Sequence, residues 1–571
     1  MSNLFFRNPR YFALVIALII SAGVSSILTI GRQEDPTITN LFATIITPYP
    51  GATPARVEAL VTEKIEEELR ELEVIKVISS VSRTGVSVIS VELSEFIDDT
   101  TIEQTWSEIR DALADAEINF PQGVGKSDFD NDRTGAYTTL SAITSADGVN
   151  VSPGILKRYA EQLQNRLRAV SGTELVRLFG DQDEEVLVAV DPDRLVSLGL
   201  TVNDVAAAIS AADTKVEAGR VRGDHADYLI EVGGEIEDLD RVRAVPILTA
   251  ATGQITRIGD IASVSRSVRT PESSMAITDG VAAVVVAAKM QPDLQVDVWA
   301  AAAERVLLEF ERDLPGGITH DLLFNQARYT VDRLTGLGIN LLIGVGLVIA
   351  VMLVTLGWRA ALVVAAVLPL TALLSVSILQ RLEIPIHQMS VTGLIVALGL
   401  LVDAAIVMTD EIRRRIVAGM ARAKAVSASV KRLAAPLLAS TVTTVLAFMP
   451  MAILPGPAGD FVGSIAISVI VMLLSSLLLA LTITPAMAGF ILPDHAEGSD
   501  EWWRLGVMAA PIQDVFKRSL DWALANRGLS VAVALTLPIM GFVAFPTLTA
   551  QFFPGVDRDQ FYVQIRLPEG A

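Results

Sequence analysis

The sequence predicts a polytopic α-helical membrane protein that carries a large external α+β domain. Of its 571 residues, 51% are hydrophobic, which is too apolar for an ordinary soluble protein of several domains. A helix needs roughly 20 apolar residues to cross a bilayer core about 30 Å thick. Seven stretches meet or approach this length, at residues 11–30, 337–356, 360–379, 389–409, 433–454, 464–491 and 529–549.

The first apolar stretch is expected to stay in the protein as an anchor. It is longer than the apolar core of a secretory signal, about 7 to 15 residues, and it lacks a clear A-x-A cleavage site. Lys and Arg in short loops then set the orientation, because such loops remain cytoplasmic. We therefore expect the N-terminus inside and the long acidic segment outside, in the periplasm of a Gram-negative source. The basic residues on the inner side are Arg7, Arg10, Arg359, those in the run 413–432, Lys517, Arg518 and Arg527.

The external segment alternates short β-branched runs with helical patterns, which is typical of βαβ units. These patterns predict a first sandwich in residues 31–135, a second in 136–180 and 271–330, and an inserted subdomain in 181–270. Both sandwiches are expected to be ferredoxin-like α+β units. Strand patterns lie at 41–47, 75–81, 86–93, 138–144, 174–178, 274–278, 282–289 and 318–323, and helical patterns at 54–72, 102–116, 153–170 and 295–312.

Internal similarity links the two ends of the chain. Residues 8–52 and 526–571 each begin with Asn, pass through one apolar stretch and an acidic, Pro-containing linker, and end in a Gly-Ala pair. Repeats of this kind indicate duplicated halves, although two spans with similar flanks also arise by chance. We expect the chain to be the N-terminal half of a longer protein. The other divisions are 1–30 (N-terminus and first span), 331–492 (second to sixth spans), 493–528 (cytoplasmic connector), 529–550 (seventh span) and 551–571 (start of a second external domain).

Asp403 is a carboxylate within the fourth apolar stretch, in the run Gly399–Met408. An ionised Asp at mid-membrane costs at least about 2.5 kcal/mol, so it must face protein or water and pair with a cation or take a proton. Burial favours its neutral form and a nearby cation its charged form, and a carboxyl balanced between them can relay protons. The alternative is a structural hydrogen bond between helices. No Lys or Arg lies inside any of the seven stretches, so a partner cation is expected from outside this chain.

Tyr137 and Phe179 stand at the edges of predicted strands in the second sandwich. Aromatic side chains there can line an apolar ligand pocket, and they can equally belong to the core. No cofactor or metal site is expected: Cys is absent, the four His residues are scattered, and no phosphate loop, dinucleotide fingerprint or nucleophile elbow occurs. We therefore expect a transporter rather than an enzyme. The formal net charge of −20 disfavours a nucleic-acid partner.

Several motifs, in their order along the chain, resemble the resistance-nodulation-division (RND) superfamily and, within it, the hydrophobe/amphiphile efflux branch. The resemblance covers essentially the whole chain. Its motifs are Tyr49–Ala52, Ser82–Gly85, Leu178–Gly180, Gly399–Val407, Phe448–Met451 and Thr484–Ala486.

This resemblance implies a homotrimer of twelve-span protomers in the bacterial inner membrane. Each half would carry two porter subdomains and an inserted docking subdomain. It also implies a tripartite pump with a periplasmic adaptor protein and an outer-membrane channel, which expels drugs, dyes and detergents in exchange for protons taken up at Asp403. Phe179 and Tyr137 match aromatic positions of the family's substrate pocket.

One position departs from the multidrug pattern. Multidrug members often carry two adjacent acids in the fourth span, whereas Ala404 follows Asp403 here. A single acid followed by Ala also occurs in the heavy-metal branch, so metal-cation efflux by the same relay is the alternative. Met275 and Met290 are isolated and do not decide between these classes. A membrane sensor or scaffold is a third hypothesis, but it would need no buried acid.

Overall fold

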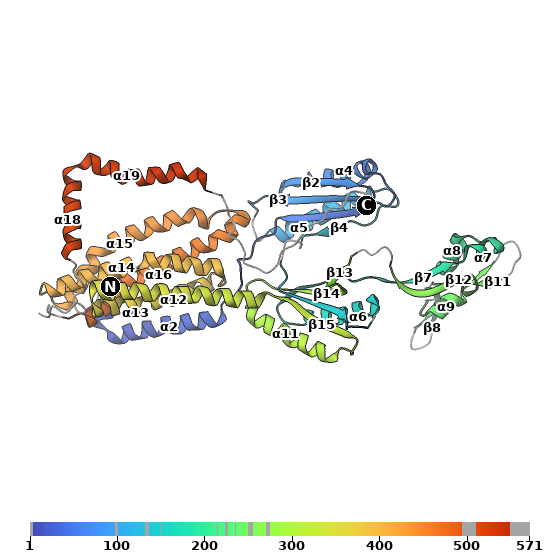
Figure 1. The fold of residues 1–571 in the computed structure, drawn as a ribbon, viewed down its shortest axis with the longest axis horizontal. Coiled ribbons are helices and arrows are strands. Elements are labelled where there is room, and N and C mark those ends of the chain that lie inside the picture. Colours follow the sequence, from blue (N-terminus) through green and yellow to red (C-terminus); the bar gives the residue numbers. More distant parts are fainter. Residues whose placement is uncertain are drawn as a thin grey trace. The chain divides into compact units, whose positions relative to one another are not determined.

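The computed structural model describes residues 4–97, 101–131, 136–149, 151–213, 215–222, 227–233, 236–248, 255–269, 274–493 and 510–548 (Figure 1). The chain divides into a large unit, within 1–350 and 359–497, and a small unit, within 351–358 and 498–571. The described residues contain long apolar helices and mixed α/β segments, as the sequence predicts. The predicted start of a second external domain, 551–571, lies outside the described residues.

The first sandwich is an antiparallel sheet of order β2-β3-β1-β4 packed against helices. Alternate side chains of β1, such as Ala43, Ile45 and Thr47, are buried, because successive residues of a strand point to opposite faces. The core beneath them includes Ile65 and Trp106. The elements are β1 (Phe42–Pro48), α3 (Pro54–Val57), the π-helical η1 (Glu58–Thr62), α4 (Glu63–Leu69), β2 (Ile75–Arg83), β3 (Val86–Leu93), α5 (Ile102–Ile118) and β4 (Asp128–Asp130).

The second sandwich is built on β14, which pairs antiparallel with β5, β6 and β13, while β15 pairs with β5. Ile143, Val284 and Val286 share a core with the apolar sides of the two helices α6 and α11. These helices therefore cover the same face of the sheet. The elements are β5 (Thr139–Ser145), α6 (Pro153–Arg168), β6 (Thr173–Phe179), β13 (Ala276–Thr278), β14 (Val281–Met290), α11 (Val296–Asp313) and β15 (Ile318–Asn325).

The segment between β6 and β13 forms elements with a core of their own. Strands β7 and β12 pair with each other, as do β8 with β9 and β10 with β11. The elements are β7 (Glu184–Val190), α7 (Pro192–Leu198), α8 (Val202–Ala212), β8 (Lys215–Arg222), β9 (Asp227–Gly233), α9 (Leu239–Ala244), β10 (Pro246–Leu248), β11 (Ile255–Arg257), α10 (Ile258–Ile261) and β12 (Ala262–Val268).

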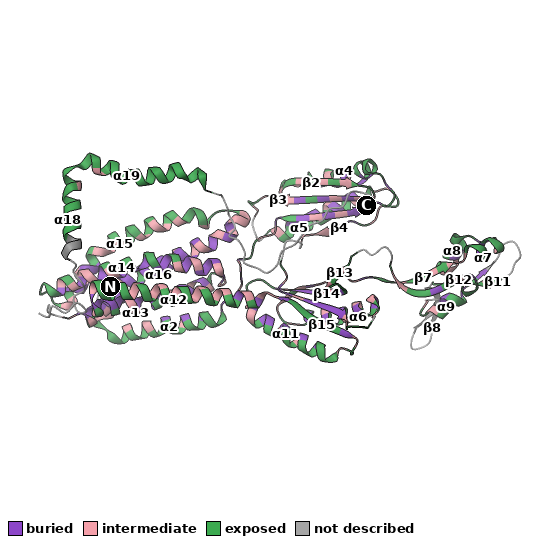
Figure 2. Ribbon diagram, in the orientation of Figure 1, coloured by how far each residue is buried: buried purple, intermediate pink, exposed green. Residues whose placement is uncertain are grey.

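Among the described residues, seven helices are long and apolar enough to cross a membrane, or up to eight if the bent pair α7–α8 forms one span. The apolar part of α16 is 61% buried, whereas those of α15 and α19 have no buried residue (Figure 2). Helix α12 begins at Gln326, directly after β15, so about three turns of mixed polar and apolar residues precede the apolar stretch that starts at 337. The helices are α2 (Pro9–Thr29), α12 (Gln326–Leu356), α13 (Trp358–Arg381), α14 (Gln388–Val417), α15 (Arg422–Ala452), α16 (Gly456–Ile491) and α19 (Arg527–Ala544), with the shorter α1 (Leu4–Arg7) and α18 (Ala510–Ala525).

Candidate functional site

Asp403 lies in the middle of α14, on a face of the helix that the rest of the described chain leaves uncovered. Val396, Leu400 and Val407 share this face by their helical spacing and are 45%, 43% and 44% exposed, and Asp403 itself is exposed. On the other side of the helix, Met408 is fully buried. The carboxylate therefore projects from an apolar stripe whose side chains are each more than 40% exposed within the described chain.

Among the described residues, no cation pairs with Asp403. No side-chain nitrogen of Lys, Arg or His lies within 4.0 Å of its carboxylate oxygens, the limit for an ion pair. Ion pairs on the same helix form further along the chain, between Arg414 and Asp410 at 2.7 Å and between Arg415 and Glu411 at 2.8 Å.

The buried side of α14 is held close to α16 by small residues. A Cβ added at Gly393 would lie 2.6 Å from the carbonyl oxygen of Ile465 and 2.9 Å from the Cβ of Ser468. Further along, the Ser476 hydroxyl donates a hydrogen bond of 3.1 Å to the Leu401 carbonyl oxygen. Small residues and interhelical hydroxyl bonds are the usual means by which membrane helices pack closely. They fix the rotation of α14, and with it the direction of Asp403.

Tyr137 and Phe179 are brought together in an edge-to-face pair. Their ring centroids are 5.7 Å apart and the planes meet at 80°, a geometry that aromatic rings favour. Phe179 ends β6 opposite Val285 of β14. Because Leu178 packs into the core under the helices, Phe179 points to the other face of the sheet, where it is 43% exposed. The pair is thus partly open on the sheet face that the helices do not cover.

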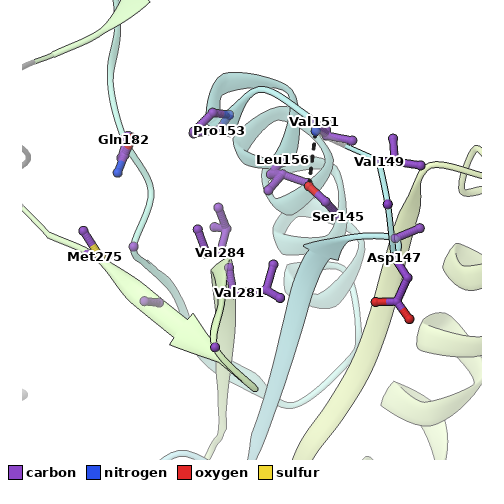
Figure 3. A pocket seen from close by; sticks show the side chains of 17 residues that line it. Ser145, Asp147, Val149, Val151, Pro153, Leu156, Gln182, Met275, Val281 and Val284 are labelled. Carbon is purple, nitrogen blue, oxygen red and sulfur yellow. Dashed lines mark hydrogen bonds between the residues drawn. The ribbon is translucent and has the colours of Figure 1, made fainter.

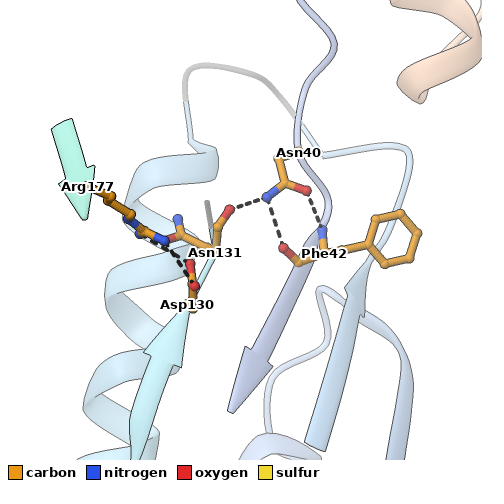
Figure 4. Close-up of polar contacts among 5 residues, drawn as sticks. All are labelled: Asn40, Phe42, Asp130, Asn131 and Arg177. Atoms are coloured by element: carbon orange, nitrogen blue, oxygen red, sulfur yellow. Dashed lines mark hydrogen bonds and ion pairs between the residues drawn. The ribbon is translucent and has the colours of Figure 1, made fainter. Parts of the chain in front are cut away.

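An ion pair joins this same sheet face to the first sandwich. Arg177, two residues before Phe179 on β6, donates to the carboxylate of Asp130 at 3.2 and 3.4 Å (Figure 4). Next to it, the side-chain amide of Asn40 donates to the backbone oxygen of Asn131. Strands β6 and β4 therefore lie beside each other, and the aromatic pair belongs to the region where the two sandwiches meet.

A cavity of about 540 Å³ lies at the end of the second sheet where α6 begins, and its walls include Leu156 and Val284 of the core under the helices. Its walls are mainly aliphatic side chains or backbone (Figure 3). They also include Gly180, which directly follows Phe179. This volume is within the range of small-molecule pockets, about 300–1,000 Å³. The lining side chains include Ser145, Asp147, Val151, Leu156, Gln182 and Met275.

Gln182 is the most informative residue of this cavity. Only 8% of it is exposed, and its amide oxygen has no hydrogen-bond partner within the described chain. A buried amide without a partner costs about 1–3 kcal/mol, so a ligand that donates a hydrogen bond would relieve this cost. The Ser145 hydroxyl, by contrast, already accepts a bond of 3.3 Å from the Val151 amide. No local pattern in the sequence marks Gln182, because its burial depends on segments far away in the chain.

The two methionines considered for metal binding lie in different surroundings. Met290 is 9% exposed and belongs to the core of the second sandwich, whereas Met275 is 59% exposed and lines the cavity. Within the described ranges, no group of at least three His, Cys, Asp or Glu side chains is arranged to hold a metal ion. The two methionines therefore do not form a common site.

Comparison with known proteins adds a family and a set of distant relatives. Residues 1–571 match the model of the AcrB/AcrD/AcrF family. The chain is 25% identical to an uncharacterised transporter of Haemophilus influenzae, with 98% of this chain and 54% of the relative covered. It is 24% identical to multidrug resistance protein MdtC of Serratia proteamaculans, with 97% and 54% covered.

A third relative is named for a different role. The cation efflux system protein CzcA of an Alcaligenes species is 25% identical, with 93% of this chain and 51% of the relative covered. The chain spans about half the length of the curated relatives it matches.

Proposed function

Since the chain belongs to the AcrB/AcrD/AcrF family of RND permeases, we propose that it forms part of a proton-driven efflux permease in which Asp403 carries the proton. The observation that carries this proposal is the position of Asp403 on the uncovered, apolar face of α14. An isolated ionised Asp at the centre of a membrane helix costs roughly 2.5–3.5 kcal/mol. A partner must therefore neutralise it, or it must bind a proton.

In this proposal, helices outside the present chain cover the face that contains Val396, Leu400, Asp403 and Val407. A Lys or Arg on such a helix pairs with the carboxylate in one state of the cycle. When a proton from the outer side neutralises Asp403, this pair is released and the helices can shift. Loss of the proton to the cytoplasm restores the pair, so that each cycle moves one proton inward.

Asp403→Asn in the full-length permease tests this role. We expect proton uptake into membrane vesicles, followed by a pH-sensitive dye, to lose its dependence on substrate, and efflux to be abolished. Asp410→Asn is the matched control, because Asp410 lies on the same helix but pairs with Arg414. Efflux that persists in Asp403→Asn at the rate of the control would refute the relay.

For the substrate we favour hydrophobic or amphiphilic compounds, such as drugs, dyes and detergents. Two features support this class: the partly exposed edge-to-face pair of Tyr137 and Phe179, and the aliphatic cavity with the unpaired amide oxygen of Gln182. An amphiphile that carries a hydrogen-bond donor would fill the aliphatic cavity and donate to the amide oxygen of Gln182. Efflux of heavy-metal cations is the second candidate, because Ala404 follows Asp403 and because CzcA is among the relatives.

Phe179→Ala separates the two classes. We expect it to lower dye or detergent efflux at least about tenfold through loss of aromatic contact area. Phe96→Ala serves as the control, since Phe96 is 78% exposed in the first sandwich. Cells that express the permease are then grown with dyes and detergents, or with copper and silver salts. Protection against the metals alone, unaffected by Phe179→Ala, would favour cation efflux.

The assembly follows from the same proposal. We place the permease in the bacterial inner membrane as a multi-pass protein whose large α+β domain lies in the periplasm. It would act as a homotrimer together with a periplasmic adaptor protein and an outer-membrane channel. Cross-linking of the full-length protein in cells, followed by mass determination, would test the trimer and identify the partners.

A further inference from the structure

Residues 31–35, here called the linker segment, run between two other parts of the chain as soon as they leave α2. Arg32 forms a parallel bridge with Gln295 on one side and another with Ile386 on the other. The linker segment is therefore the middle of three parallel backbone segments. One neighbour leads into α11 of the second sandwich, and the other leads into α14, the helix of Asp403.

On the first side, backbone bonds and an ion pair tie the linker segment to the start of α11. The Arg32 amide donates to the Leu294 oxygen at 3.0 Å, and the Val296 amide donates to the Arg32 oxygen at 3.0 Å. The Arg32 guanidinium pairs with Asp297 in the first turn of α11 at 2.5 Å, with both side chains about one-third exposed, 32% and 28%. The preceding Gln295 donates through its side-chain amide to the Leu28 oxygen in the last turn of α2 and to the oxygen of Ile30, the residue that follows this helix.

On the second side, the linker segment bonds to the residues that open α14. The Ile386 amide donates to the Gly31 oxygen at 2.8 Å, the Gln33 amide to the Ile386 oxygen at 3.0 Å, and the Gln388 amide to the Glu34 oxygen at 3.1 Å. Gln388 is the first residue of α14, so its amide has no acceptor within the helix. The linker segment thus supplies an acceptor for the beginning of this helix.

Side chains strengthen the same end of α14. Gln388 bonds through its amide nitrogen to Asp35 and through its amide oxygen to Arg333 of α12, the latter at 2.7 Å. His387 is 1% exposed and caps the helix in a reciprocal pair with Ser390. A cap bonded on this many sides leaves the first turn little freedom to move independently of the linker segment.

Gly31 shows how closely the three segments approach. A Cβ at this position would lie 2.3 Å from the Asp293 carbonyl oxygen and 3.3 Å from the Cβ of Pro385. Distances under 3.0 Å do not occur between such atoms, so a side chain at position 31 would force the linker segment and the backbone at Asp293 apart. Only glycine fits at this position, and the spacing on both sides of the linker segment depends on it.

From these contacts we propose that the linker segment is a positioning element that couples α14 to the second sandwich. Asp403 lies about 22 Å along α14 from Gln388, at about 1.5 Å per residue. A displacement of this helix on protonation therefore reaches the linker segment through backbone bonds, and it reaches α11 through Arg32. This inference rests on the proposed proton relay at Asp403 and adds the path by which the relay acts on the substrate domain.

Arg32→Ala in the full-length permease is the first test. We expect efflux to fall about 2- to 30-fold, the range for mutations that modulate coupling between sites, while the expression level and the melting temperature stay near those of the parent. The charge-swapped double variant Arg32→Asp with Asp297→Arg should recover most of the rate. Arg166→Ala is the matched control, because Arg166 pairs with Asp313 at the other end of α11, at 2.8 Å. Unchanged efflux in both Arg32→Ala and Gly31→Ala would overturn the proposal.

A second measurement separates this proposal from the relay itself. Backbone hydrogen exchange in residues 31–35 and 294–297 is compared between the parent permease and Asp403→Asn, in which the neutral amide stands in for the protonated acid. We expect a change of at least about threefold in the exchange rate of these segments. If Asp403→Asn stops efflux but leaves their exchange unchanged, the relay holds and the coupling role of the linker segment fails. If Asp403→Asn leaves efflux intact, the relay fails.

Discussion

His387 is a buried titratable residue at the N-terminal end of α14. Its Nδ1 accepts a hydrogen bond of 3.3 Å from the Ser390 amide, which requires the neutral ring, because protonated imidazole has no acceptor nitrogen. Burial lowers the pKa of His387 to about 4 from its ordinary 6.5. The folded protein therefore binds this proton less well than the unfolded chain does. The cap contributes fully to stability above pH 6.5, and the contribution is lost as the pH falls toward 4.

His387→Asn is predicted to remove this dependence. Asn can cap the helix with its side-chain oxygen but does not titrate. With about 1.4 kcal/mol per pKa unit, the parent protein should lose about 3 kcal/mol of unfolding free energy between pH 7 and pH 4 that the variant retains. The measurement is denaturant unfolding of the purified protein across this pH range. Parallel pH profiles of the parent and the variant would show that His387 does not titrate as proposed.

At the scale of elements, α14 is fixed on its buried side by contact with α16. Gly393 allows this contact, since a Cβ there would lie 2.6 Å from the Ile465 oxygen. On the other face of the same helix, nothing lies within 4 Å of a Cβ at Gly399. The helix thus has one tightly packed face and one open face, and Asp403 is on the open one.

Gly393→Ala should therefore push α14 and α16 apart and lower the unfolding free energy by about 1–3 kcal/mol, as overpacked cores do. Gly338→Ala in α12 is the control. A Cβ at Gly338 meets nothing within 4 Å, so this change should be neutral or stabilising by about 0.5–1 kcal/mol. Both values can be measured by denaturant unfolding in the same detergent. Equal effects of the two substitutions would contradict close packing at Gly393.

Local patterns in the sequence predicted many elements well. The helical pattern at 102–116 became α5 (Ile102–Ile118), and the strand pattern at 282–289 became β14 (Val281–Met290). The single helix predicted at 54–72 was wrong in detail, because a π-helical turn at Glu58–Thr62 interrupts it and α4 ends at Leu69. Periodicity reports which side of an element is apolar, and it carries no information on such a local change of helix type.

At the scale of the whole molecule, the features that could not be predicted depend on residues far apart in the chain. The linker segment bonds to residues near 295 and near 386, and no local pattern marks either partner. The unpaired amide of Gln182 likewise results from burial by distant segments. By contrast, Asp403 could be singled out from the apolar composition of the stretch around it, because a carboxylate in a membrane-spanning helix is costly wherever its partner lies.

The ion pair between Arg177 of β6 and Asp130 of β4 joins the two sandwiches (Figure 4). The side chain of Arg177 is 34% exposed and that of Asp130 is 12% exposed, so water screens this ion pair less than a surface pair. A double-mutant cycle with Arg177→Ala and Asp130→Ala should give a coupling energy of about 1 kcal/mol in the unfolding free energy. Arg177→Ala alone should cost more than this, because it leaves the carboxylate of Asp130 buried beside the strand without this partner.

A more exposed ion pair, between Arg158 and Glu184, provides the comparison for this cycle. The two charged groups are 2.8 Å apart, and their side chains are 52% and 34% exposed. Its coupling should be smaller, about 0.3 kcal/mol, because both charges remain solvated. The difference between the two cycles measures how strongly the sandwiches are joined at the sheet face that carries Phe179. If the Arg177–Asp130 coupling is no larger than that of the exposed pair, then the contact between β4 and β6 adds little to stability. Substrate could in that case separate the two strands at low cost.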